Sequence, residues 1–406
     1  MKKLLIAFLG LTTFLSCNQE SDIIGQTSLD SVAPGIITNA TVKNGPGSAK
    51  VSYVLPADAD VSYVKATYKV NDKVTRTAIA SYYNNELLLE GFGEVKPYTV
   101  TIVTVDQSRN ESAPVEVVVN PEMAPVQVAR QSLIVVKDFG GINIQWLNPD
   151  KKNLNIEVDV NDLKNNGFFV QNNVIYSAEA VGNVNVRGFA PVVRTFRITI
   201  VDRWGNRSEP FLIEIIPFEE IKIDLTKIAT PTINFAALTT NPIPMLYDGI
   251  LPTTPNTGNG LIANSPWTLP GGPAVIRPQV TMDFGKKVKL SRMLQWQRNQ
   301  TNQNYLYNHL NTKTFKVYGS NTAPSADVND YTGWILIQDG EIVKPSGLPL
   351  GQLSTADTQQ AAAGHLMNFS IDTPAYRYFR YELTNNWSGN LRFQVAELQI
   401  FGNYEN

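Results

Sequence analysis

An internal repeat constrains what the first half of this chain can fold into. The segment Val105–Pro114 aligns with Val201–Pro210 at an offset of 96 residues, with Val, Asp, Asn, Ser and Pro at matching positions. Further upstream, Val51–Pro56 aligns with Ile144–Pro149 at an offset of 93 residues. A period of roughly 95 residues is the length of one antiparallel β-sandwich. The repeated segments also have the alternating, β-branched and aromatic pattern of short strands. We therefore predict two tandem sandwiches, over residues 32–123 and 124–219.

A turn with the pattern Asp-x-x-x-Asn-x-Ser recurs before the last strand of each copy. Both copies resemble the immunoglobulin-like and fibronectin-III-like domains of Bacteroidetes lipoproteins. Hard oxygen ligands suit calcium, but Asp and Asn also bond the backbone of tight turns. We expect the turn role for Asp106, Asn110, Asp202 and Asn206. Trp146 lies between apolar neighbours in a strand pattern, so we expect it in the core. Neither copy contains a catalytic constellation, and we interpret both as spacers.

Residues 220–406 contain a third series of β-type runs, each closed by Gly, Asp, Asn or Pro. The series includes Val280–Gly285, Thr314–Ser320, Tyr376–Glu382 and Ala396–Gly402, and it is typical of an antiparallel sandwich. Its order and sequence resemble a discoidin-type, galactose-binding-like jelly roll. Such folds present ligands on loops at one end of two rigid sheets. The predicted fold class is therefore all-β, with two tandem Ig/fibronectin-III-like sandwiches followed by a galactose-binding-like (discoidin) jelly roll.

Two loops rich in amides and aromatic residues follow predicted strands of this third part, at residues 299–311 and 384–390. Sugar recognition needs an apolar plate for the C–H face of the ring and fixed hydrogen-bond groups for its hydroxyls. The resemblance implies that such a site lies on loops at this end of the fold. The candidate plates are Trp296, Tyr305, Tyr307 and Trp387, and the candidate donors and acceptors are Arg298, Asn302, Asn304, His309 and Arg392. The alternative is a surface loop that its tyrosines only hold in place. We expect Trp267 to be a packing residue rather than a sugar platform.

The discoidin resemblance also implies a structural cation. In such modules an early Asp-Gly loop lies beside the ion, with a Glu from the last strand nearby. Asp248 and Glu397 match those positions and would form a calcium site with loop carbonyls. A turn Asp and a rim Glu without metal is the alternative. The insertion Val343–Gly364 departs from the simplest discoidin pattern, and we expect a loop and one short helix that ends at Gly364.

The N-terminus predicts where the protein is held. Two lysines precede the apolar segment Leu4–Leu15, which is too short to span a hydrocarbon core of about 30 Å but fits a signal peptide. It ends at Phe14-Leu15-Ser16-Cys17, which resembles a bacterial lipobox with Phe in place of the usual Leu. Cys17 is the only cysteine of the chain, and the resemblance implies that its thiol carries lipid. An ordinary signal peptide, in which Cys17 is incidental, is the alternative.

We therefore expect residues 1–17 to be a lipoprotein signal peptide and lipobox, and residues 18–31 to be a polar tether. The acidic patch Asn18–Asp22 resembles the surface-export signal of Bacteroidetes lipoproteins, and a generic polar tether is the alternative. The expected location is the outer membrane, with the protein lipid-anchored and facing the cell exterior.

Composition excludes several classes of function. The formal charge is −2 and no dense Lys/Arg run follows the N-terminus, which argues against nucleic acid. Two histidines leave little room for a His-based site, and a single cysteine excludes an intrachain disulfide framework. Glycosidase chemistry needs two facing carboxylates about 5–9.5 Å apart, whereas the acidic residues are scattered among turns. We therefore do not expect an enzyme.

These observations lead to two hypotheses of different kinds. The first is a non-catalytic surface lipoprotein of the polysaccharide-utilisation type, which binds glycan through the C-terminal module. The second is a structural or protein-interaction lipoprotein that docks to an outer-membrane glycan importer or to an enzyme, without a sugar site of its own.

Overall fold

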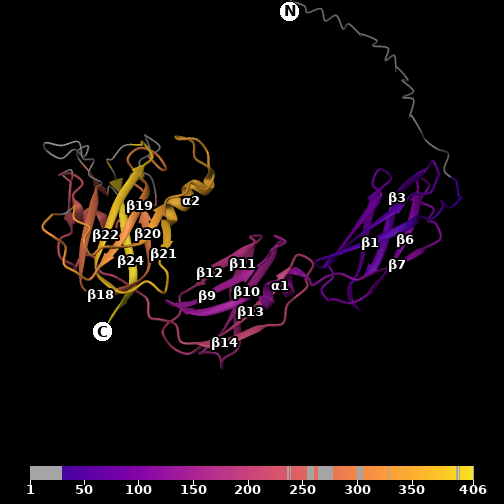
Figure 1. The fold of residues 1–406 in the computed structure, drawn as a ribbon, viewed down its shortest axis with the longest axis horizontal. Coiled ribbons are helices and arrows are strands. Elements are labelled where there is room, and N and C mark those ends of the chain that lie inside the picture. Colours follow the sequence, from indigo (N-terminus) through magenta and orange to yellow (C-terminus); the bar gives the residue numbers. More distant parts are fainter. Residues whose placement is uncertain are drawn as a thin grey trace, which may run out of the picture.

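The computed structural model describes residues 30–235, 237, 239–253, 260–263, 278–299, 305–327, 329–389, 392 and 394–405. Three hydrophobic cores follow one another along the chain, formed within residues 37–119, 124–215 and 221–404. Figure 1 shows the three corresponding domains in this order, from indigo to yellow. Almost all regular structure is antiparallel β-strand, so the predicted all-β fold class is confirmed. In the part of the chain described, no helix has the length and apolar character needed to cross a membrane.

The first domain is a sandwich of two antiparallel sheets. Its strands are β1 (Thr38–Gly45), β2 (Ser48–Val54), β3 (Val61–Lys69), β4 (Thr75–Ser81), β5 (Glu86–Glu90), β6 (Tyr98–Asp106) and β7 (Val115–Val119). One sheet has the order β1-β2-β5 and the other β4-β3-β6-β7. Alternate residues of β2, namely Ala49, Val51 and Tyr53, are buried between the sheets, which is the pattern of a strand with one face in the core.

The second domain repeats this arrangement after a short helix. It contains α1 (Pro125–Gln131), β8 (Ile134–Asp138), β9 (Gly141–Leu147), β10 (Leu154–Asn161), β11 (Phe169–Ser177), β12 (Val181–Val186), β13 (Arg194–Asp202) and β14 (Phe211–Ile215). Its sheets have the orders β12-β9-β8 and β11-β10-β13-β14. Trp146 is buried in its core, as expected. The sequence analysis did not predict α1, which begins with Pro125 and buries Val126 and Ala129.

The recurring Asp-x-x-x-Asn turn has the same bonds in both copies. Asp106 Oδ1 accepts from the Asn110 backbone N at 2.8 Å, and its Oδ2 accepts from Asn110 Nδ2 at 2.9 Å. Asp202 accepts from Asn206 in the same way, at 2.9 Å for both bonds. Each aspartate therefore satisfies donors of its own turn, which confirms the expected turn role.

The C-terminal domain is built around one long strand. Its elements are β15 (Ile221–Lys222), β16 (Thr232–Ile233), η1 (Ile243–Leu246), β17 (Leu261–Ile262), β18 (Gln279–Trp296), β19 (Thr312–Ser320), β20 (Ile335–Glu341), α2 (Thr355–Ala363), β21 (His365–Asn368), β22 (Tyr376–Asn386), β23 (Gln394–Val395) and β24 (Glu397–Tyr404). The main sheet has the order β15-β24-β18-β22-β19-β20, and β17 pairs with β23. β18 pairs with β22 from Gln279 to Asp283 and again at Val288, and it pairs with β24 from Val288 onward.

The predicted helix of the insertion is present as α2. Ser354 caps its N-terminus, because its side chain accepts from the Asp357 backbone N while the Asp357 carboxylate accepts from the Ser354 backbone N. This is a capping box. Gly364 follows its last residue with φ +85°, a conformation that favours glycine. The expected end of the helix at Gly364 is therefore confirmed.

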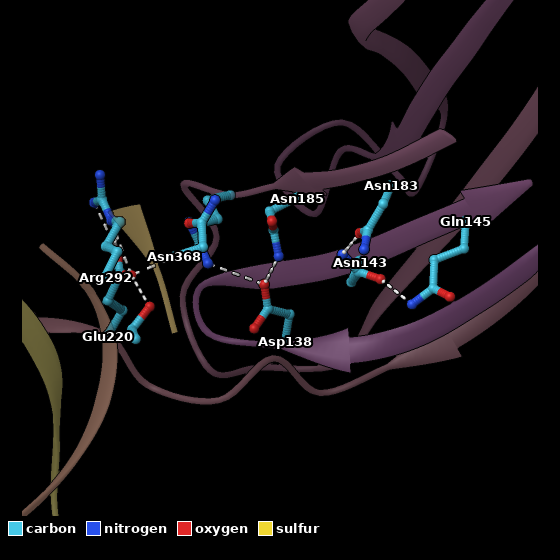
Figure 2. Close-up of polar contacts among 10 residues, drawn as sticks. Asp138, Asn143, Gln145, Asn183, Asn185, Glu220, Arg292 and Asn368 are labelled. Atoms are coloured by element: carbon cyan, nitrogen blue, oxygen red, sulfur yellow. Dashed lines mark hydrogen bonds and ion pairs between the residues drawn. The ribbon is translucent and has the colours of Figure 1, made fainter. Parts of the chain in front are cut away.

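Polar side chains join the second domain to the C-terminal domain (Figure 2). Glu220, in the connecting segment, accepts from Arg292 Nε at 3.0 Å and from Arg292 Nη2 at 2.8 Å. Arg187 of the second domain donates to Asn368 at 2.6 Å and to Asp138 at 3.2 Å. Arg187 also lies 3.8 Å from Glu220 and is largely shielded from solvent. Because its contacts with Asn368 and Glu220 cross the joint, they restrict how the two domains move relative to each other.

Candidate functional site

The two loops that the sequence analysis singled out lie side by side in the structure. We call the described residues of these two loops, 297–299, 305–311, 384–389, 392 and 394–396, the loop site. The Ser388 backbone N donates to the His309 carbonyl at 3.0 Å, and the Trp387 N donates to the Asn311 carbonyl at 3.2 Å. The Gln394 N donates to the Leu310 carbonyl at 2.9 Å. The loops therefore form one surface where β18 and β22 end and β19 begins.

One buried asparagine fixes the first of these loops. Asn311 is 0% exposed. Its Nδ2 donates to the carbonyls of Arg298 at 3.0 Å and Tyr305 at 2.7 Å, and its Oδ1 accepts from the Arg298 backbone N at 2.9 Å. The sequence analysis did not assign a role to Asn311. Its position at the last residue of an amide-rich loop was the only signal available.

The same loop contains two non-glycine residues in the left-handed region. Tyr307 and His309 both have φ +50°, which is uncommon for residues with a Cβ. The Tyr307 backbone N donates to Gln297 Oε1 at 2.6 Å, and the His309 N donates to Asn308 Oδ1 at 2.8 Å. Backbone conformations of this kind persist where surrounding contacts fix them, and they are frequent at binding sites.

Two of the predicted sugar plates are buried, and this corrects the prediction for them. Trp296 is 4% exposed and donates from Nε1 to the Ala362 carbonyl at 3.1 Å. Tyr307 is 0% exposed, and its hydroxyl donates to the Asp357 carbonyl at 3.2 Å. Both acceptors belong to α2. The inserted helix therefore covers these rings, and neither can offer a face to a sugar.

Tyr305 and Trp387 remain as half-buried rings of the loop site. The centroids of the Tyr305 and His309 rings are 4.5 Å apart, and Trp387 meets Tyr307 edge-on at 5.6 Å. Each ring also has a cation beside it. The guanidinium carbon of Arg298 is 5.5 Å from the Tyr305 centroid, and Nζ of Lys313 is 5.2 Å from the Trp387 centroid.

The remaining predicted site residues have different outcomes. Arg392 lies at the second loop, with Nε and Nη2 each 3.4 Å from the Ala263 carbonyl oxygen. Asn302, Asn304, Trp267 and Cys17 lie outside the described residues, as do residues 1–29. The sequence analysis did not assign a role to Lys313, because it follows the loop in a strand pattern where a charged residue usually faces solvent.

The two predicted metal ligands line one cavity of about 390 Å³, together with Lys222, Asp224 and Tyr247. Glu397 is 1% exposed, and its Oε2 accepts from the Gly249 backbone N at 3.1 Å. Burial raises the pKa of Glu397 to about 7, and the charge of Asp248 adds to the rise. The buried carboxylate of Glu397 and the exposed carboxylate of Asp248 both supply the hard oxygen ligands that calcium prefers. The residues therefore fit a cation, and calcium binding stays a prediction.

Comparisons with known proteins agree with a division of the chain into several units. Three family models, each described as a domain of unknown function, match residues 34–121 (DUF4959), 122–226 (DUF5126) and 258–402 (DUF5000). No curated protein matches the sequence.

Several solved structures are similar to parts of the chain. A SusE-like protein is 24% identical, with a TM-score of 0.41, covering 69% of this chain and 100% of its own. The CBM32-1 and CBM32-2 domains of ZmpB from Clostridium perfringens are 12% identical, with a TM-score of 0.31, covering 45% of this chain and 37% of their own. A putative chitobiase fragment from Bacteroides thetaiotaomicron is 15% identical, with a TM-score of 0.30, covering 46% of this chain and 95% of its own.

Proposed function

We propose that this protein is a non-catalytic, lipid-anchored surface protein that binds glycan through the loop site. The observation that carries the proposal is the fixed pair of rings, Tyr305 and Trp387, on two loops bonded to each other. Half-buried aromatic rings supply apolar surface for the C–H face of a sugar. Arg298 and the backbone of the loops supply hydrogen-bond groups for its hydroxyls.

The loop site lacks the side chains that sugar hydrolysis requires. Residues 297–311 and 384–396 contain no Asp or Glu. A glycosidase of the usual kind needs two carboxylates that flank the scissile bond. Binding without hydrolysis is therefore the function that these loops support best.

The other parts of the chain hold the loop site at a distance from its anchor. Cys17 carries the lipid, residues 18–31 form the tether, and the first two domains act as spacers. In this proposal the protein lies on the outer membrane and faces the exterior, and a glycan captured by the loop site passes to an outer-membrane glycan importer. Calcium held by Asp248 and Glu397 stabilises the C-terminal domain and takes no part in chemistry.

Binding of oligosaccharides to loop-site variants tests the proposal. Affinity gels and a glycan array are compared for the wild-type protein, Tyr305→Ala and Trp387→Ala. We expect dissociation constants of about 10⁻⁴ to 10⁻⁶ M for the wild type. Each substitution should weaken binding by about 10-fold or more, because aromatic anchors carry much of the energy of such contacts.

The matched control is Tyr83→Ala, which removes a tyrosine that is 93% exposed on the first domain. It should bind like the wild type. Unchanged binding in both loop-site variants would contradict the proposed site. Failure of the wild type to bind any glycan would favour the protein-interaction alternative, in which the same loops dock to an importer subunit or an enzyme.

A further inference from the structure

The cations of the loop site indicate which class of glycan it selects. We propose that the loop site prefers acidic glycans, in which a carboxylate or sulfate group pairs with Arg298 and Lys313. This inference rests on the proposed function and names its ligand class.

The charge of the loop site is opposite to that of the whole chain. The chain has a formal charge of −2, whereas the two loops contain Arg298 and Arg392 and no acidic residue, and Lys313 lies two residues after the first loop. A local excess of positive charge raises the local concentration of negatively charged ligands. The loop site therefore attracts anions although the protein as a whole does not.

Arg298 lacks the carboxylate partner that several other arginines of this protein have. Arg197, Arg292 and Arg377 each bond a carboxylate, at 2.8 Å in their shortest contacts. Within the described residues, the Arg298 guanidinium has no ion pair and its shielded Nε has no hydrogen-bond acceptor. Burial lowers the pKa of Arg298, so its charge is incompletely solvated. A guanidinium in this state gains from a planar anion, which it can bind with two parallel hydrogen bonds.

Lys313 is the second cation without an anionic partner. In the described part of the chain its ammonium group makes no ion pair and lies 5.2 Å from the centroid of the Trp387 ring. Lys313 and Arg298 belong to one surface, because Trp387 and the residue after it are hydrogen-bonded to the loop that carries Tyr305. Two cations on loops that are bonded to each other can contact successive residues of an acidic chain.

The position of the cations also disfavours neutral sugars. A cation over a ring competes with the C–H face of a sugar for the same aromatic surface. A neutral sugar must displace or bypass that cation and offers it no charge in return. An acidic sugar instead offers the cation a charge-assisted hydrogen bond, which is about twice as strong as a neutral one.

The experiment uses the purified full-length protein and pairs of oligosaccharides that differ only in charge. One pair is a galacturonic acid oligomer and its methyl ester, and the other is a sulfated galactan oligomer and its desulfated form. Affinities are measured by isothermal titration calorimetry at low and at physiological ionic strength. At least one acidic form should bind about 10-fold or more tightly than its neutral partner, and added salt should reduce that difference.

Substitution of the two cations tests their roles directly. The double variant R298Q/K313Q should bind the acidic and the neutral form of each pair with similar affinity, because glutamine offers no charge to the carboxylate or sulfate group. The control K286Q/K287Q removes two exposed lysines from the turn within β18, and it should retain the preference. Circular dichroism and the thermal midpoint verify that each variant is folded.

The outcomes separate this inference from the proposed function. Equal binding of acidic and neutral forms would overturn the acidic preference and leave glycan binding in place. Equal binding of polyglutamate and the acidic sugars would show charge attraction without sugar recognition and would also overturn it. Absence of binding to every oligosaccharide would overturn the proposed function together with the inference.

Discussion

The guanidinium carbon of Arg76, on the first domain, lies 4.4 Å from the centroid of the Trp204 ring of the second domain. Arg203 lies at 4.4 Å from the same ring and bonds Glu90 of the first domain at 2.7 Å. Arg76 also donates to the Trp204 carbonyl at 3.0 Å. The repeated turn of the second domain therefore forms the joint with the first domain.

The first prediction concerns this joint. In the first copy of the repeat, Ser108 occupies the position of Trp204, so Trp204→Ser leaves a turn that the repeat already uses. We expect the variant to retain the stability of each domain but to lose the ring that Arg76 and Arg203 contact, a contribution of about 0.5–2 kcal/mol. Small-angle X-ray scattering should then show a broader distribution of interdomain distances. Ser108→Ala is the control, and an unchanged scattering profile for Trp204→Ser would contradict the role of the joint.

The second prediction concerns the contact between the inserted helix and the core. A Cβ added at Gly364 would lie 2.6 Å from Cε2 of Trp296, and the glycine has φ +85°. Gly364→Ala therefore combines a steric clash with an unfavourable backbone conformation, and we expect it to lower the free energy of unfolding by about 2–4 kcal/mol. Urea unfolding followed by tryptophan fluorescence measures the loss.

A glycine of the same insertion provides the control for this substitution. Gly347 has φ +64°, and a Cβ added there would meet nothing within 4 Å. Gly347→Ala should therefore lower the free energy of unfolding only through its unfavourable backbone conformation, by about 1–2 kcal/mol. Equal losses for the two variants would show that the contact between Trp296 and Gly364 is not tightly packed.

The third prediction is a pH dependence of stability. His365 is buried beside Tyr307, and burial lowers its pKa to about 4 from an ordinary value of 6.5. Because the folded state favours the neutral ring, the unfolded chain binds a proton more readily between these two values. The contribution of the neutral His365 ring to the free energy of unfolding is therefore fully present above pH 6.5. It is lost as the pH falls toward 4, by at most about 3 kcal/mol.

Chemical unfolding of the wild type and of His365→Gln across pH 4–7.5 measures this contribution. The variant should show a shallower fall in the free energy of unfolding over the acidic part of this range. His309→Gln removes the other histidine of the chain and should retain the slope that His365 causes. Identical slopes in the wild type and His365→Gln would contradict the assignment.

Local patterns predicted the elements, whereas contacts between distant segments decided the site. The repeat and its alternating residues predicted the strands, and Trp146 could be assigned to the core from its apolar neighbours alone. Trp296 and Tyr307 look like surface aromatics in sequence because only the fold brings Ala362 and Asp357 over them. The discoidin resemblance implied that a site would lie on loops at this end of the fold. Helix α1 is only seven residues long, which is too short for a clear helical period.

The role of Asn311 could not be predicted for a similar reason. Its amide bonds two carbonyls that are 13 and 6 residues away in the chain, and nothing in the local sequence distinguishes it from the other amides of the loop. The sequence also does not show which Arg or Lys side chains have no anionic partner, because this depends on which carboxylates lie near each cation in the fold. The proposed preference of the loop site for acidic ligands therefore rests on the contacts of Arg298 and Lys313 in the folded structure.

The last prediction is stabilisation of the C-terminal domain by calcium. Asp248 and Glu397 line one cavity, and a divalent cation there would favour the ionised form of Glu397, which burial alone disfavours. At a calcium concentration 100-fold above the dissociation constant, binding contributes about 2.7 kcal/mol, which corresponds to a rise of about 5–10 °C in the melting temperature of a domain of this size. Differential scanning calorimetry in calcium and in EDTA measures the rise, with magnesium as a comparison ion.

Glu397→Gln and Asp248→Asn should each abolish most of this stabilisation, since each removes one charged ligand. Asp372→Asn, at an exposed turn of the same domain, is the control and should respond to calcium like the wild type. Glu397→Gln also replaces a buried carboxylate with a neutral amide, so its melting temperature in EDTA should equal or exceed that of the wild type at pH 8. Equal melting temperatures of the wild type in calcium and in EDTA would leave the pair as a turn aspartate and a buried, protonatable glutamate.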